Sequence, residues 1–286
     1  MKKYYLITAV LLLVAAWLVF SASPGNLEVY FFDVGQGDAI LIKTPSGGTV
    51  LIDGGPDRKI LRHLGSALPF SKRTIDLMIL SHPHADHVTG LVGVLERYKI
   101  RQVMATRVLH TTQEYLEWLR QITEQKIPWQ TAVAGQTITF PKGVKLEVLW
   151  PQNNVEDIKV HDLNTSSIAV RLVFGETAAL FTGDITVENE SEILASGLPV
   201  SAQLLKVPHQ GSNTSSSSDF IQSVAPSWAI ISVGKNNRFG HPYGEIIARY
   251  ESMDVKVLRT DQQGTIRFKS DGKEWQFLKR WGLLNF

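Results

Sequence analysis

The segment Ser81-His82-Pro83-His84-Ala85-Asp86-His87 constrains most strongly what this chain can fold into. It places three of the chain's eight histidines and one carboxylate within six consecutive residues. The apolar run at residues 77–80 predicts a short buried strand before it, and residues 88–95 are predicted to be helical. The motif is therefore expected in the loop at the carboxyl end of a strand, where open α/β sheets bind their ligands.

The spacing within this motif predicts a metal site. His82 and His84 are two residues apart in an extended segment and are expected to point the same way, whereas Asp86 and His87 follow on a turn and face a second position. One loop can thus supply ligands to two metal ions. Imidazole and carboxylate without thiolate suit Zn²⁺, Mn²⁺ or iron. The chain contains no cysteine, which excludes disulfides and cysteine nucleophiles.

Length and composition favour one domain. The chain has 286 residues, of which 44% are hydrophobic, enough for a sizeable core. No internal repeat or long low-complexity linker divides it, so we expect a single domain over residues 24–286.

The N-terminus predicts a targeting segment. Lys2 and Lys3 precede an uncharged run at residues 4–20 and then several small residues, so residues 1–23 are either a signal peptide or a membrane anchor. Both alternatives place the rest of the chain outside the cytoplasmic membrane. These two lysines are the whole surplus of 29 basic over 27 acidic residues. The remaining chain therefore lacks the basic excess typical of nonspecific nucleic-acid binding.

Residues 27–33, 39–43 and 49–53 predict an opening antiparallel sheet. The glycine-rich turn between the first two strands can bring Gln36 and Asp38 close to a bound substrate, although an ordinary hairpin turn is an alternative. Asp53 ends the third strand. We expect its carboxylate to orient a metal-ligating histidine from behind, or else to cap a turn.

Three strand-like apolar runs in the second half each end at polar side chains. The runs are residues 178–183, 204–208 and 228–234, and they lead into Asp184, into His209, and into the group Asn236, Asn237 and His241. Since the first motif also follows such a run, we expect all these side chains to converge on one edge of the sheets.

In combination these motifs resemble the metallo-β-lactamase superfamily, and more narrowly the soluble domain of ComEC-type competence proteins. The likeness covers residues 27–268. It is carried by residues 32–39 (FDVGQGDA), 51–55 (LIDGG), 81–87 (SHPHADH), 182–184 (TGD), 207–212 (VPHQGS), 232–234 (SVG) and 240–242 (GHP).

The resemblance implies an α/β fold, an αβ/βα four-layer sandwich, preceded here by an N-terminal hydrophobic helix. It also implies two divalent metal ions, Zn²⁺ or Mn²⁺. His82 and His84 would hold one ion, Asp86, His87 and His209 would hold the other, and Asp184 would bridge them. Asn164 stands where the superfamily often has a further histidine, which leaves the first ion with fewer ligands unless His161 substitutes.

The leading functional hypothesis is a hydrolase in which a metal-activated water attacks a phosphodiester, such as single-stranded DNA, outside the cytoplasmic membrane. Asp184 would orient the water, and His241 would donate to substrate oxygens or protonate the leaving group. Asn236 and Asn237 would also contact substrate. The alternatives are hydrolysis of a small ester or a β-lactam, and a noncatalytic module of a DNA-uptake machine. The multi-helix pore of ComEC proteins is absent from this sequence.

Overall fold

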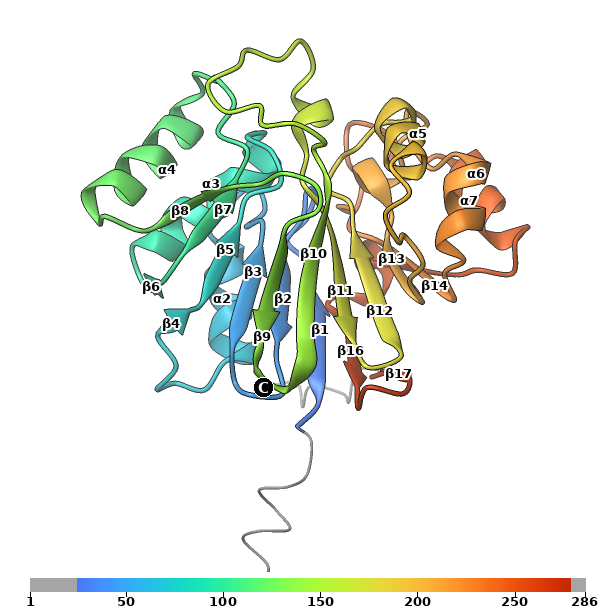
Figure 1. The fold of residues 1–286 in the computed structure, drawn as a ribbon, viewed down its shortest axis with the longest axis horizontal. Coiled ribbons are helices and arrows are strands. Elements are labelled where there is room, and N and C mark those ends of the chain that lie inside the picture. Colours follow the sequence, from blue (N-terminus) through green and yellow to red (C-terminus); the bar gives the residue numbers. More distant parts are fainter. Residues whose placement is uncertain (1–24, 279–286) are drawn as a thin grey trace, which may run out of the picture.

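The computed structural model describes residues 25–278, so the hydrophobic helix predicted within residues 1–23 lies outside the described part. Two large sheets face each other and helices cover their outer faces (Figure 1). Within residues 25–278, no helix has the length and apolar character needed to cross a membrane.

The first sheet contains, in spatial order, β17 (Trp275–Phe277), β16 (Ile266–Ser270), β1 (Leu27–Phe31), β2 (Ile40–Lys43), β3 (Thr49–Ile52), β5 (Leu77–Ile79), β7 (Val103–Ala105) and β8 (Trp129–Thr131). The second contains β15 (Lys256–Arg259), β14 (Trp228–Ile231), β13 (Leu204–Lys206), β12 (Thr177–Phe181), β11 (Ala169–Phe174), β10 (Val144–Trp150) and β9 (Thr137–Phe140). A small third sheet pairs β4 (Thr74–Ile75) with β6 (Lys99–Ile100).

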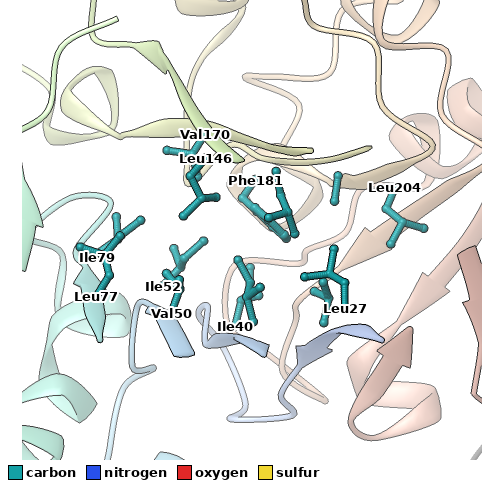
Figure 2. Close-up of a cluster of buried hydrophobic side chains, with 14 of the residues drawn as sticks. Leu27, Ile40, Val50, Ile52, Leu77, Ile79, Leu146, Val170, Phe181 and Leu204 are labelled. Atoms are coloured by element: carbon teal, nitrogen blue, oxygen red, sulfur yellow. The ribbon is translucent and has the colours of Figure 1, made fainter. Parts of the chain in front are cut away.

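The period of two along the strands creates the layers. In β1, Leu27, Val29 and Phe31 point into the space between the large sheets, whereas Tyr30 points to the outer, helix-covered side. Figure 2 shows this central core, in which Leu27, Ile40, Val50 and Leu77 of the first sheet face Leu146, Val170, Phe181 and Leu204 of the second. Both faces of the central strands are buried, as expected for sheets covered on both sides.

Two groups of helices complete the sandwich. The first sheet packs against α2 (Lys59–Ala67), α3 (Ala85–Leu95) and α4 (Gln113–Glu124). The second packs against α5 (Val187–Ala195), α6 (Ser218–Val224) and α7 (Gly244–Glu251). Short helical turns occur at α8 (Thr260–Gln263), η1 (Pro141–Gly143), η2 (Leu163–Ser166) and η3 (Pro208–Gly211). This arrangement confirms the predicted αβ/βα sandwich.

The predicted elements differ from the structure mainly at their boundaries and in the second half. Helix α3 begins at Ala85 rather than residue 88, so Asp86 and His87 lie on its first turn, where the carboxylate of Asp86 also favours the helix N-terminus. The pattern of the sequence did not identify β8 or helices α5 to α7. Residues 275–277 form a strand at the edge of the first sheet.

Helix α3 is fixed against the turn after β3 by direct backbone contact. The amide of Gly54 donates to the carbonyl of His87 at 2.8 Å, and the amide of Gly90 donates to the carbonyl of Gly55 at 3.0 Å. A Cβ atom at Gly90 would lie 1.9 Å from the carbonyl oxygen of Gly54. This close approach, which requires glycine, sets the distance between Asp53 and His87.

We expect Gly90→Ala to lower the free energy of unfolding by about 3 kcal/mol, because the added methyl group meets backbone that cannot move aside. Gly65→Ala is the matched control, since Gly65 lies in α2 with open space around it. That change should instead stabilise the protein by about 0.5 to 1 kcal/mol. Urea unfolding of both variants measures the difference, and equal stabilities would contradict the proposed docking of α3.

Candidate metal centre

The candidate residues meet at the carboxyl ends of strands from both sheets. Strand β5 leads into His82 and His84, and β3 leads into Asp53. In the second sheet the parallel strands β12 and β13 lead into Asp184 and His209. The sandwich therefore assembles the site from chain segments more than a hundred residues apart.

One oxygen of Asp184 lies among three imidazoles. Its Oδ2 is 3.3 Å from His87 Nε2, 3.9 Å from His209 Nε2 and 4.0 Å from His82 Nε2. The two longer distances exceed hydrogen-bonding range but suit ligands that share a cation. Asp184 and His82 are almost fully buried, and His209 is 22% exposed. Asp184 Oδ2 and these imidazoles are therefore candidate ligands of a shared cation.

The tautomers of two histidines follow from Asp53 and Ser81. Asp53 Oδ2 lies 2.9 Å from His87 Nδ1 and accepts the Ser81 hydroxyl proton at 2.7 Å. Having donated to Asp53, Ser81 Oγ accepts from His82 Nδ1 at 3.1 Å. Both imidazoles thus present Nε2 to the site. Asp53 lies where the sequence predicted, whereas the sequence analysis did not single out Ser81.

The ring nitrogens of His82 and His84 form a second group of candidate ligand atoms. Nε2 of His82 and Nδ1 of His84 lie 2.9 Å apart. Burial first, and the neighbouring His87 next, lower the pKa of both side chains below the ordinary value of histidine. Both rings are therefore neutral at pH 7, as metal ligands must be.

Lys206, which the sequence analysis missed, is a buried cation inside the site. Its ammonium group forms an ion pair with Asp38, lies 3.4 Å from Asp184 Oδ1 and donates to the carbonyl of Gly183 at 2.8 Å. Burial alone would lower the pKa of Lys206, but the carboxylates of Asp38 and Asp184 outweigh it and raise the pKa. The only sequence signal was a lysine in an otherwise apolar strand just before His209.

A chain of amides holds Asp86. Gln210 donates to Asp86 Oδ2 at 2.8 Å and accepts from Gln36, whose own carbonyl oxygen accepts from the amide of Gly234 at 3.0 Å. We predicted that Gln36 contacts substrate, but both polar atoms of its side chain bond to protein. Gln36 therefore positions Asp86 through Gln210.

Two further residues predicted to contact substrate have protein partners in the structure. Asp38 is only 1% exposed, and its carboxylate forms an ion pair with Lys206. Asn237 uses its side chain within the loop, because Nδ2 donates to the carbonyls of Gly234 and His241, and Oδ1 accepts from the amides of Phe239 and His241. Asn236 is exposed on the same loop.

His241 borders the centre, and Asn164 lies on the loop before β11. The ring centroid of His241 is 5.6 Å from that of His209, and burial lowers the pKa of His241 below the ordinary value. Asn164 lies in η2 with its Oδ1 buried and without a hydrogen-bond partner among the described residues. His161, the possible substitute ligand, is exposed.

The donor set fits divalent cations. The carboxylates of Asp38, Asp53, Asp86 and Asp184 outnumber the cationic groups paired with them, Lys206 and His87, which leaves an excess of negative charge. His87 Nε2 is buried without a hydrogen-bond partner among the described residues. His82, His87 and Asp184 place three ligand atoms within 4.8 Å of one another. Buried charge and open ligand atoms of this kind are what a metal ion requires.

A family model described as the metallo-beta-lactamase superfamily matches residues 32–235. The chain belongs to this superfamily. The membership confirms the resemblance that the motifs indicated, and a solved superfamily structure agrees. The metallo-beta-lactamase fold protein YhfI from Bacillus subtilis superimposes with a TM-score of 0.52 at 13% identity, covering 81% of this chain and 95% of that one.

Among curated superfamily relatives, ComE operon protein 3 from Bacillus subtilis is 29% identical over 259 residues, 85% of this chain. Competence protein ComA from Neisseria gonorrhoeae is 30% identical over 255 residues, 86% of this chain. The chain spans 33% of the length of each. Ribonuclease Z from Aeropyrum pernix is 33% identical over 132 residues, 42% of this chain and 41% of that protein.

Metal binding should release a proton from His87. Burial would lower the pKa of His87, but the carboxylates of Asp184, Asp86 and Asp53 outweigh it and raise the pKa well above the ordinary value. In the metal-free protein the proton on His87 therefore stabilises the fold. This stabilisation is complete below the ordinary pKa of histidine and is lost as pH rises through the raised pKa of His87. Zinc must displace that proton, so affinity should increase as pH rises.

Calorimetric titration of metal-free protein with Zn²⁺ at about pH 7, in buffers of different ionisation enthalpy, should show release of about one proton. His161→Asn removes an exposed histidine and should leave the release unchanged. Zinc affinity that does not vary with pH would contradict this assignment.

Lys206→Met should destabilise the metal-free protein by about 3 to 5 kcal/mol, because it leaves the buried carboxylate of Asp38 without its partner. Adding Asp38→Asn removes that uncompensated charge and should recover part of the loss. Urea unfolding compares the two variants with the parent protein. If Lys206→Met alone is as stable as the parent protein, the ion pair between Lys206 and Asp38 does not hold the site.

Proposed function

We propose that this chain is a metal-dependent hydrolase of phosphodiesters that uses two divalent cations, Zn²⁺ or Mn²⁺. The observation that carries the proposal is the position of Asp184 Oδ2 among the imidazole nitrogens of His82, His87 and His209. The pair His82 and His84 supports one cation position. Asp86, His87 and His209 support the other, with Asp184 shared between them.

Two bound cations would lower the pKa of a water towards neutrality and offset the negative charge that develops on the substrate. The side chains of the protein would orient the attacking water and the metal ligands. Asp184 would accept a hydrogen bond from the attacking water, and the chain from Gln36 through Gln210 would hold Asp86 in place. Since the pKa of His241 is lowered, this side chain is neutral at pH 7, which suits a hydrogen-bond donor to a substrate oxygen better than a proton donor.

A basic cavity beside the turn at Gln36, outside the candidate metal centre, supports an anionic substrate. This cavity of about 1340 Å³ adjoins the turn at Gln36 and the loop after β14. Four basic residues and a single acidic residue, Asp33, line it. The basic residues are Lys59, Arg62, Lys235 and Arg267. A small neutral ester would have no use for this excess of positive charge. The partial similarity to ribonuclease Z supports phosphodiester chemistry.

A noncatalytic role is the second candidate, favoured by Asn164. By the resemblance, this residue stands where the superfamily often has a histidine ligand, and the nearby His161 is exposed. A scaffold with an eroded first metal position should bind at most one ion per chain. The hydrolase should bind two, so metal content after loading separates the two candidates.

We also propose that the domain works outside the cytoplasmic membrane, held or exported by residues 1–23. Lys2, Lys3 and the apolar run after them support this location. Single-stranded DNA or a similar phosphodiester is the proposed partner. Similarity to a competence protein supports a role beside DNA uptake.

The test is hydrolysis of bis(4-nitrophenyl) phosphate and of a single-stranded oligonucleotide with added Mn²⁺ or Zn²⁺. Asp184→Asn keeps the shape of the side chain but removes its charge, and it should reduce the rate at least about 100-fold. Glu192→Gln, an exposed change on α5, is the control and should keep full activity. An Asp184→Asn variant as active as the parent would contradict the proposed function.

A further inference from the structure

A row of aromatic side chains extends from His209 of the metal centre along the loop after β14. The ring of His209 contacts that of His241, with centroids 5.6 Å apart. His241 in turn stacks with Phe239, at 5.8 Å and an interplanar angle of 24°, and contacts Tyr243 at 5.6 Å. We call Arg238, Phe239, His241 and Tyr243 the aromatic rim.

The outer members of the aromatic rim face solvent. Phe239 is 49% exposed and Tyr243 is 38% exposed. The guanidinium group of Arg238 lies over the ring of Phe239, 4.9 Å from its centroid. Two half-exposed rings beside a candidate active site offer an apolar surface to a ligand bound there.

The aromatic rim is held in place before any ligand arrives. The four hydrogen bonds of Asn237 tie the loop together from Gly234 to His241. The amide of Tyr243 donates to the carbonyl of Gly211 at 3.0 Å, which connects the rim to the segment that carries His209. The backbone that carries the rings is therefore fixed relative to the metal centre, so binding does not have to order this loop.

We propose that the aromatic rim is a base-stacking subsite for single-stranded nucleic acid. Exposed rings stack on bases of any sequence, and an arginine beside them pairs with phosphate. Lys235, on the same loop, lines the basic cavity and extends the positive charge beyond the rim. This inference rests on the proposed phosphodiester hydrolase and narrows its substrates to chains that carry bases.

The test measures binding without turnover. Metal-free protein in EDTA is titrated into a fluorescein-labelled oligothymidylate of about 12 nucleotides and, separately, into an abasic oligomer of equal length and charge. The parent should bind the base-bearing oligomer more tightly. Phe239→Ala should weaken that binding about tenfold and leave the abasic oligomer unaffected, whereas Phe239→Trp should retain binding.

Phe70→Ala is a matched control. Phe70 is also an exposed ring under an arginine, with Arg73 5.0 Å from its centroid, but it lies outside the aromatic rim. This change should not affect binding. Equal affinity of the parent for both oligomers, no binding to either, or equal losses for Phe70→Ala and Phe239→Ala would overturn the proposal. Failure of the parent to cleave phosphodiesters would instead refute the proposed function and leave this binding result standing.

Discussion

The candidate metal centre depends on the two carboxylate oxygens of Asp184, which face two different kinds of partner. Lys206 lies beside Oδ1 and leaves Oδ2 to face three imidazoles. The carboxylate comes from the second sheet, whereas two of those imidazoles come from the first, so the centre forms only when the two sheets pack together. A buried carboxylate in that position is tolerable because lysine and protonated histidine offset its charge until cations replace the proton.

The same region stores backbone strain. Asp53, His209 and Gln210 adopt left-handed conformations with φ of 58°, 46° and 56°, although none is glycine. Such residues persist only where the surrounding contacts determine them. Here the strained positions are those whose side chains orient His87, face Asp184 and hold Asp86. The geometry of the site is therefore imposed by packing and hydrogen bonds rather than by local preference.

Much of this arrangement followed from the sequence. Polar residues at the ends of apolar runs predicted that His82, Asp184 and His209 would meet. Asp184 and His209 follow parallel strands of one sheet, and His82 joins them because the two sheets pack face to face. Contacts between side chains far apart in the sequence could not be predicted in this way. Nothing local reveals that the lysine of β13 meets an aspartate 168 positions earlier, or that Gln36 bonds to Gln210. Asp38 and Asn237 had suitable chemistry for substrate contact, but burial and loop hydrogen bonds occupy them.

The most direct test of the metal centre is anomalous diffraction from crystals of the zinc-loaded protein, recorded on both sides of the zinc absorption edge. The account predicts two peaks roughly 3.5 to 4 Å apart, on either side of Asp184 Oδ2. One should lie beside His82 and His84, and the other beside His87 and His209. A single peak, or zinc bound away from these side chains, would contradict it.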